Sequence, residues 1–452
     1  MAKEIINDLT VGSVPKKLFR FALPFMLSTL LQTAYGLADM AIVGNCVGKE
    51  GLSAVSIANQ IIWVTTALSI GFTNAGQVIV SQLVGSGKRA ELQKTIGTVT
   101  TVVLAIAVFI TVLGLALCGP VLRLMKTPAE AMPGAKSYLT VVFLGSVFTF
   151  GYNLVSSLFR GMGDSRHPLM FVAISSSVNV VLDLITVAGL GWGVVGAAAA
   201  TVTGQAVALA ISVSYLYKNR EGFGFDFKVS SLRVERRCLG QLVRLGLPFS
   251  LQFAAISISM LFVNRFVNTY GVTASATFGT GTRIEQIPWI MINGIMMAAA
   301  TMIGQNMGAG NRERMKKTVN IAAIVCAVSA AVFMALFYLL PREIYSLFTD
   351  DAEVLEMAPM FMLALVVSLP ATSMMCPYQA FIEGIGNAKL TMIIALLDGF
   401  VSRIAISLIL AELLHMGLMG WFLGYGLAAY VNTVLCVIYY YSGIWKKRKA
   451  LV

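Results

Sequence analysis

The chain has 452 residues, of which 57% are hydrophobic and only 12% are charged, and its mean hydropathy is +0.81. Soluble domains carry about a quarter charged residues, and a large soluble helical core would need an amphipathic outer layer, which no segment here supplies. The composition therefore excludes a soluble protein and predicts an all-α integral membrane protein.

Apolar runs recur along the whole chain, and each is long enough to cross the ~30 Å hydrocarbon core of a bilayer. Several are longer than 25 residues, which indicates tilt, kinks or ends that leave the membrane. The twelve predicted spans are 17–45, 52–84, 93–118, 136–160, 168–189, 193–217, 240–270, 273–305, 318–340, 355–383, 390–412 and 417–441.

The basic residues behind the net charge of +12 lie mainly in segments on one side of the membrane, so the charge does not indicate a nucleic-acid partner. With twelve spans and an inner N-terminus, 25 of the 33 Lys and Arg residues fall on the inner side. Such an excess is the positive-inside bias of membrane proteins. We therefore expect a multi-pass protein of the cell membrane with both termini in the cytoplasm.

The sequence contains an internal repeat. Four pairs of segments match in the same order along the chain, at a separation of 223 or 224 residues, and such self-similarity indicates a duplicated architecture. The pairs are FALPFML (21–27) with LGLPFSL (245–251), QLVGSGKRAELQKT (82–95) with QNMGAGNRERMKKT (305–318), FRGMGDS (159–165) with IEGIGNA (382–388), and GVVGAAAA (193–200) with GLMGWFLG (417–424).

Each half holds six spans, so both halves begin on the same side of the membrane. The repeat therefore predicts two six-helix bundles related by a pseudo-two-fold axis along the membrane normal, as in transporters with parallel repeats. The expected division is an N-terminal lobe (1–217), a cytoplasmic linker (218–239) and a C-terminal lobe (240–452).

Two GxG sequences, at 85–87 and 161–163, look like phosphate-binding loops. Neither follows a strand, and each lies between two helical runs, so they are predicted to be turns in which Gly ends a helix. Pro24 and Pro248 occupy equivalent repeat positions early in spans 1 and 7. They are either hinges that kink their helices or prolines of a first helical turn.

Four carboxylates lie well inside the spans, at Asp39, Asp183, Glu285 and Asp398. Intramembrane ionisable residues usually face a cavity or the bundle interior and are functional candidates. Asn179 lies one helical turn before Asp183 on the same face, and Thr201 can approach from span 6. With Asp39, this set could hold a small cation or share a proton, or it could only fasten the helices together.

The second half does not repeat this set. At the same offset, Arg403 replaces Asn179, Ser407 replaces Asp183 and Val263 replaces Asp39. The charged residues of the second half mix both signs: ion pairs of Arg265 or Arg283 with Glu285 are as consistent with the sequence as substrate contacts are.

With these residues in view, the whole chain resembles the multidrug and toxic compound extrusion (MATE) family of transporters. The resemblance rests on the six-plus-six spans, the GxG turns, Pro24 in ALP and QTAYGLAD in span 1. It is most specific in the polar set of the first lobe. Residues at the positions of the family's cation or proton site are Gln32, Tyr35, Asp39, Asn179, Asp183, Ala197 and Thr201, and Tyr138 and Asn153 match less distinctively.

The resemblance implies an antiporter that exports drug-like, often cationic, organic compounds in exchange for H⁺ or Na⁺, with no other cofactor. Na⁺ would be held by Asp39, Asn179, Asp183 and Thr201. Some members also bind Na⁺ with carboxylates of spans 7 and 10, which this chain lacks apart from Glu383 at the end of span 10. We expect a monomer in contact with membrane lipid and a small organic substrate.

Two alternatives remain at this point. A flippase for a lipid-linked precursor would share the architecture but need a strongly cationic cavity, for which the sequence offers only three scattered Arg residues. An integral membrane enzyme or receptor is disfavoured, because the sequence shows no clustered reaction centre and is built from two repeated halves.

Overall fold

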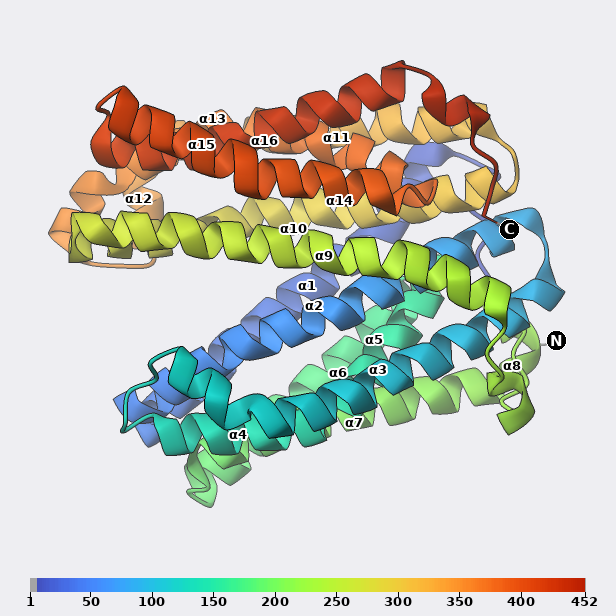
Figure 1. Cartoon of the computed structure of the whole chain (residues 1–452), viewed down its shortest axis with the longest axis horizontal. Coiled ribbons are helices and arrows are strands. Elements are labelled where there is room, and N and C mark those ends of the chain that lie inside the picture. The colour runs from blue at the N-terminus through green and yellow to red at the C-terminus, as the bar shows by residue number, and fades with distance from the viewer. Residues whose placement is uncertain (1–5, 452) are drawn as a thin grey trace. The chain divides into compact units, whose positions relative to one another are not determined.

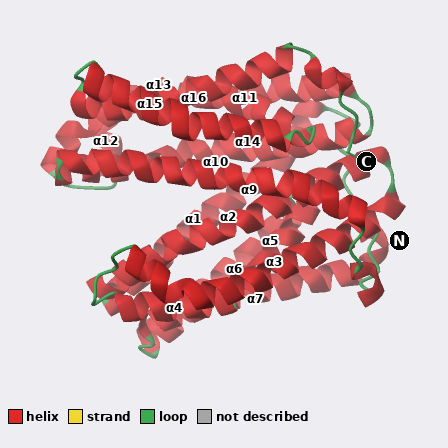
Figure 2. Cartoon of the chain, viewed as in Figure 1, coloured by secondary structure: helices red, strands yellow, loops and turns green. Residues whose placement is uncertain are grey.

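A computed structural model describes residues 6–451, and Lys3, which was counted on the inner side, lies outside this range. Figure 2 shows helices joined by short loops, with no strand in the described part of the chain. This all-α architecture confirms the fold class expected from composition.

The chain forms two compact units. One contains residues 23–250 together with the described residues before Leu9, and the other contains residues 9–22 and 251–451. The long helices α1 (Val14–Val47) and α9 (Arg236–Val267) each belong to both units, since the division falls within them. We call the two units the first and second lobe.

The elements of the two lobes follow the same order along the chain (Figure 1). Besides α1, the first lobe contains α2 (Lys49–Ser86), α3 (Arg89–Leu124), α4 (Met132–Leu144), α5 (Ser146–Gly161), α6 (Arg166–Asp183), the π-helix η1 (Leu184–Gly189) and α7 (Gly193–Lys218). After α9 and η3 (Asn268–Tyr270), the second lobe contains α10 (Val272–Gly308), α11 (Arg312–Leu339), α12 (Pro341–Ser346), α13 (Ala352–Gly384), α14 (Ala388–Leu396), the π-helix η4 (Leu397–Arg403), α15 (Ile404–Leu408), the π-helix η5 (Ile409–Leu413), α16 (Gly417–Tyr441) and η6 (Ile444–Lys447).

Within the described residues, eleven helical spans are long and apolar enough to cross a membrane, and a twelfth results when the bent pair α4 and α5 is counted as one. These two helices meet at 51°, and Gly145 lies at the bend. A Cβ there would lie 2.4 Å from the side chain of Val202 in α7. The bend therefore requires a residue without a side chain where α7 packs against it.

The GxG sequences are turns, as predicted. Gly87 ends α2 in the left-handed conformation, with a φ of 71°, and its repeat partner Gly310 has a φ of 72°. Gly163 and Gly386 form the second equivalent pair, at 82° and 74°. L-residues rarely adopt this conformation and glycine does so without strain, so the repeat has kept the same helix ends in both lobes.

Pro24 and Pro248 both lie in helix interiors, well past the first turns of α1 and α9. The interpretation that they are first-turn prolines is therefore wrong. Both helices run through their proline without a break in this structure, and the Ser28 hydroxyl donates to the Pro24 carbonyl at 2.8 Å. A hinge role for Pro24 stays a prediction.

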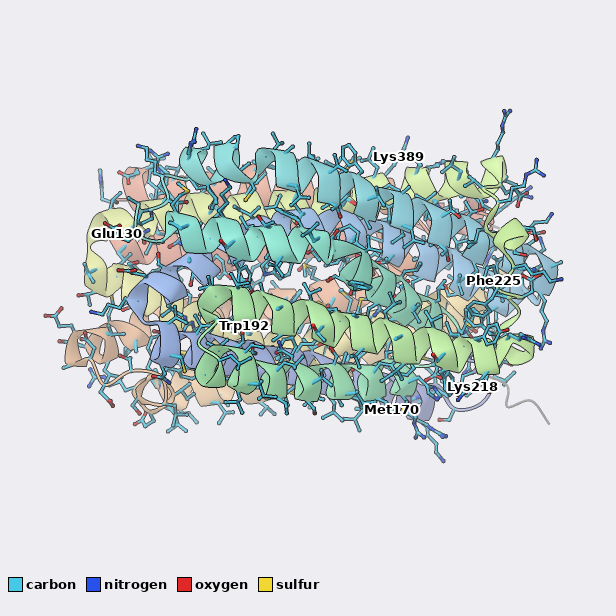
Figure 3. The ribbon with its side chains drawn as sticks, turned by 90° about the horizontal axis from the view of Figure 1, so that it is seen from below. Glu130, Met170, Trp192, Lys218, Phe225 and Lys389 are labelled. Atoms are coloured by element: carbon cyan, nitrogen blue, oxygen red, sulfur yellow. The ribbon has the colours of Figure 1, made fainter. Side chains whose placement is uncertain are left out.

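Helix α7 spans the length of the first lobe between two side chains of different character (Figure 3). Trp192 precedes its first residue and is exposed, whereas Lys218 is its last residue. Tryptophan concentrates at membrane–water interfaces, and Lys concentrates on the cytoplasmic side. The orientation inferred from the charge distribution would place the Lys218 end of α7 in the cytoplasm, and it stays a prediction.

The segment after α7 is folded against the first lobe. It forms two short helices, α8 (Arg220–Phe223) and η2 (Val229–Leu232). The Thr101 hydroxyl of α3 donates to the Leu232 carbonyl at 2.6 Å, and a hydrogen bond with Ser231 lowers the pKa of Asp226. Gly97 of α3 faces this segment so closely that a Cβ would lie 1.9 Å from the Ser231 carbonyl oxygen.

Replacing Gly97 by alanine should therefore displace the linker from α3. We expect trypsin to cut Gly97→Ala several-fold faster after Lys228 and Arg233, because the backbone oxygen of Ser231 has no way to avoid the new methyl group without moving the segment. The matched control is Gly119→Ala in the same helix, where a Cβ meets nothing within 4 Å. Equal cleavage of both variants would show that the linker is held by other contacts.

Candidate functional site

The two carboxylates of the first lobe come from different helices. Asp39 lies near the end of α1, and Asp183 is the last residue of α6, directly before the π-helix η1. Asp39 is 7% exposed and Asp183 is fully buried. Their carboxyl groups face each other within the range of a side-chain hydrogen bond, so the structure brings together the pair that the sequence singled out.

Asn179 and Thr201 join the pair from α6 and α7. The Asn179 Nδ2 donates to the Thr201 Oγ1 over 3.4 Å. Ala197, one turn earlier on α7, is fully buried, and Gly204 lets the two helices approach, since a Cβ there would lie 3.1 Å from the Ser175 carbonyl oxygen. Small residues on α7 therefore set the distance at which the amide and the hydroxyl meet.

Two tyrosines line the same site. Tyr138 of α4 is buried and interacts with Thr201 and with both carboxylates, and Tyr35 lies one turn before Asp39 on α1 and interacts with it. Gln32 is exposed and Asn153 is half-buried. In the part of the chain that the structure describes, no contact connects either of these two residues to the carboxylates.

The oxygen atoms at the centre of the site are hydrogen-bond acceptors that no donor satisfies. Among the described residues, Asp39 Oδ1, both carboxylate oxygens of Asp183 and Asn179 Oδ1 are buried and accept no hydrogen bond. Burying a charged or polar oxygen without a partner is costly. Oxygen ligands of this kind suit a proton shared between the carboxyls or a hard cation such as Na⁺.

The described residues contain no group of three or more His, Cys, Asp or Glu side chains arranged around a metal ion. The site has two carboxylates, one amide and one hydroxyl, without the imidazole or thiolate ligands that select transition metals. This donor set therefore fits a proton or a hard cation better than a transition metal.

The sequence did not single out an anchored arginine in this lobe. Arg160, at the end of α5, donates from Nε to Gln77 Oε1 at 2.9 Å, and its guanidinium lies 5.8 Å from the centre of the Phe25 ring. Phe25 follows Pro24 directly, so this contact ties α5 to the proline region of α1. The only sequence signal was a basic residue at the end of an apolar span, which has many ordinary explanations.

The second lobe contains a different polar cluster. Glu285 of α10 accepts a hydrogen bond from the Tyr425 hydroxyl of α16 at 2.5 Å, and Arg403 pairs with Asp398 at 3.1 Å. The suggested ion pair of Arg265 or Arg283 with Glu285 is wrong, because both arginines are exposed and Glu285 binds the phenol instead.

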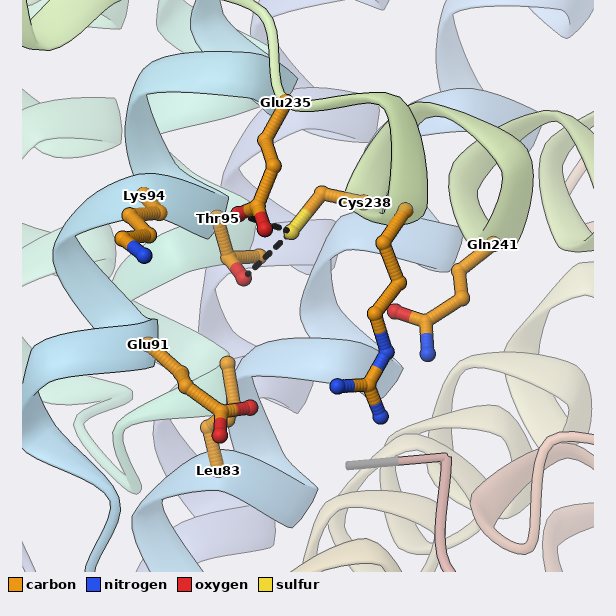
Figure 4. Close-up of a pocket in the computed structure, with 8 residues that line it drawn as sticks. Leu83, Glu91, Lys94, Thr95, Glu235, Cys238 and Gln241 are labelled. Carbon is orange, nitrogen blue, oxygen red and sulfur yellow. Dashed lines mark hydrogen bonds between the residues drawn. The ribbon is translucent and has the colours of Figure 1, made fainter.

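A small cavity of about 140 Å³ lies elsewhere in the first lobe, beside the start of α9 (Figure 4). The Cys238 thiol donates to Glu235 over 3.4 Å and lies 3.5 Å from the Thr95 hydroxyl. The lining is mostly polar and balances two acidic against two basic side chains, so it does not offer the apolar surface that a drug-like compound needs. Its residues are Leu83, Glu91, Lys94, Thr95, Glu235, Arg237, Cys238 and Gln241.

Removing the hydroxyl that Asn179 binds should weaken the site. Thr201→Val leaves the buried amide of Asn179 without its acceptor, and we expect a loss of about 1 kcal/mol of stability together with slower export of an ethidium probe. Thr201→Ser keeps the hydroxyl and is the control. Melting temperatures and export rates of the two purified variants check this, and an unchanged Thr201→Val protein would show that the 3.4 Å contact contributes nothing.

Comparisons with known proteins agree with this geometry. The MatE family profile matches residues 24–185 and again residues 248–409, so the two matches reproduce the internal repeat. The probable multidrug resistance protein YpnP of Bacillus subtilis is 26% identical over 443 residues, which cover 98% of each chain. The multidrug export protein MepA of Staphylococcus haemolyticus is 25% identical over 390 residues, covering 86% of each.

The fold is also that of a solved transporter. A MOP superfamily transporter from Pyrococcus furiosus has 24% sequence identity and a TM-score of 0.92, with 99% of each chain covered. With both halves matched by the family profile and the architecture shared along its length, the chain belongs to the MatE family of multidrug efflux transporters.

Proposed function

We propose that this protein is a secondary antiporter that exports small organic compounds, often cationic, in exchange for H⁺ or Na⁺ by alternating access across the cell membrane. The observation that supports this most is the set of buried, unpartnered oxygens on Asp39, Asp183 and Asn179. The set lies inside a multi-pass lobe of a multidrug efflux family, and its oxygens are of the kind that binds a proton or a hard cation.

Coupling would follow from the charge of the pair. With both carboxyls ionised, two negative charges face one another in a poorly solvated place, and one proton or one Na⁺ removes most of that repulsion. The ion would be taken up with the lobe open to the outside and released to the cytoplasm. Substrate and ion must favour different states or compete, because a ligand with equal affinity for both states shifts nothing.

The supporting residues would act through the pair. Thr201 and Asn179 would orient the ion, Tyr138 and Tyr35 would border it, and Pro24 would let α1 bend when the charge of Asp39 changes. Gln32, Asn153 and Ala197 complete the proposed set. The termini would be cytoplasmic, and the protein would act as a monomer.

The flippase alternative receives less support. Such a protein would need free cationic side chains for a pyrophosphate, whereas Arg403 is already paired with Asp398 at 3.1 Å. A catalytic function has no described reaction centre to rest on, and the curated relatives named above are multidrug resistance and export proteins.

Asp183→Asn should abolish ethidium export driven by a proton or Na⁺ gradient in liposomes while leaving the protein folded. The amide has the shape of the carboxyl but neither its charge nor its ability to take up a proton. Asp350→Asn, in an exposed loop, is the control. Normal export by Asp183→Asn would make Asp183 a residue that only fastens helices.

Asp39→Asn should uncouple the transporter more than it weakens substrate binding. One carboxyl remains, so the paired titration is lost, whereas apolar contacts with the substrate survive. Ethidium binding and gradient-driven efflux should be measured side by side between about pH 5.5 and 8.5. An unchanged pH profile of efflux would contradict the role given to Asp39.

A further inference from the structure

The second lobe holds an intramembrane cluster of three charged groups that the coupling mechanism above does not use. The Glu285 carboxylate accepts from the Tyr425 hydroxyl at 2.5 Å, and Arg403 Nη2 donates to Asp398 Oδ2 at 3.1 Å. The Arg403 guanidinium lies 5.2 Å from the centre of the Tyr425 ring. The four side chains therefore form one connected network from α10, η4 and α16.

Asp398 and Tyr425 are buried, Glu285 and Arg403 are half-buried, and the hydrogen bonding of the network is incomplete. The side chains of Asp398 and Arg403 are 7% and 12% exposed. Within the described residues, Asp398 Oδ1 and Arg403 Nε make no hydrogen bond. Ionisable groups inside a membrane segment are functional candidates, and unsatisfied polar atoms among them call for an explanation.

The backbone is arranged to make the Asp398–Arg403 pair. The two residues are five apart and lie in the π-helix η4, whose hydrogen bonds connect residue i with i+5. Single π-turns inside α-helices are frequent at functional sites. The equivalent part of the first lobe, before Asn179, is regular α-helix, so the duplication has diverged here.

Repeat equivalence shows what has changed. Arg403 and Tyr425 stand 224 residues after Asn179 and Thr201. The first lobe thus places a neutral amide on a hydroxyl, where the second lobe places a guanidinium over a phenol ring. The second lobe therefore carries a permanent, tethered cation at the position where the first lobe offers a neutral ligand.

Of the three charged groups, the Glu285 carboxylate has no direct ion-pair partner. Arg403 neutralises Asp398, which it contacts directly, and Glu285 has only a neutral phenol as its hydrogen-bond partner. The charged and titratable groups that act on Glu285 from other elements are Tyr425 and Arg403. Arg283, on the same helix, is exposed, and in the described chain the neighbouring α11 and α13 present no such group to Glu285.

A proton suits this place better than a metal ion does. Na⁺ needs several oxygen ligands around it, and at Glu285 the described chain joins a single carboxylate to one phenol oxygen. A proton on Glu285 needs no further ligand, and it removes the excess negative charge. The Tyr425 hydroxyl can then turn from donor to acceptor.

We propose that Glu285 is a second proton-binding site, located in the second lobe and independent of the Asp39–Asp183 pair, with Tyr425 as its hydrogen-bond partner and the Arg403–Asp398 ion pair as its neighbour. The use of this proton in transport rests on the antiport proposed above, but its binding does not. The two statements are therefore tested separately.

Difference infrared spectroscopy of the purified protein tests the binding, because a protonated carboxyl has a carbonyl stretch that a carboxylate lacks. In the Asp39→Asn/Asp183→Asn double variant, pH steps should still produce such a band, and adding Glu285→Gln should remove it. The matched control is Glu383→Gln, which alters another half-buried glutamate, one that accepts from Gln379 at 3.0 Å. A band that disappears with Glu383→Gln, or survives Glu285→Gln, overturns the proposal.

If Glu285→Gln does not fold, Tyr425→Phe is the second variant. It removes the phenol hydrogen bond and keeps the ring under Arg403, so the band should move to a different pH range. A band with unchanged pH dependence in Tyr425→Phe assigns it to another residue and overturns the proposal.

Ethidium efflux from liposomes tests the use of the proton. Glu285→Gln should lose part of the pH dependence that the unmodified protein shows, whereas a profile identical to that of the unmodified protein would restrict Glu285 to binding without transport and contradict the coupling statement. If the unmodified protein exports no ethidium under either gradient, the antiport itself fails, and the infrared result still decides the proton site.

Discussion

The structure depends on the cost of negative charge in places that water does not reach. Asp39 and Asp183 face one another with buried oxygens that no donor satisfies, and no basic side chain is paired with either of them in the described chain. A fold that placed these groups in apolar surroundings without compensation would be destabilised by several kcal/mol. A proton or a cation held between the carboxyls would relieve this cost, and the antiport proposed above rests on that relief.

The surrounding helices keep this arrangement fixed by close packing of small residues. A Cβ at Gly196 would lie 3.0 Å from the Thr186 hydroxyl, and one at Gly204 would lie 3.1 Å from the Ser175 carbonyl oxygen. Helix α7 thus meets α6 and η1 along a seam that admits no larger side chain, which is how helices approach closely in membranes. Asp183 ends α6, and the only π-helix of the described first lobe, η1, begins at the next residue.

The sequence predicted the spans, the repeat, the glycine turns and the residues that meet around Asp39 and Asp183, because each depends on local composition or on spacing along one helix. It missed contacts between distant segments. Tyr425 and Glu285 are 140 residues apart, and a tyrosine in an apolar span is an ordinary residue until its partner is known. The sequence likewise suggested Arg265 or Arg283 as partners of Glu285, because charge alone does not show which side of a helix faces the interior. The bend at Gly145 depends on Val202, which no local pattern reveals.

Duplication explains why one chain carries two unlike polar clusters. A repeated scaffold places equivalent positions in equivalent surroundings, so Asn179 and Arg403 inherit the same kind of buried site. The first lobe has a neutral amide at this position, whereas the second lobe has a guanidinium that pairs with Asp398. Under the two proposals above, the first lobe would balance its carboxylates with an exchangeable ion, and the second would hold a fixed cation and leave only Glu285 to change its charge. The phenol of Tyr425 would then connect that change to α16, because Tyr425 is itself the repeat partner of Thr201.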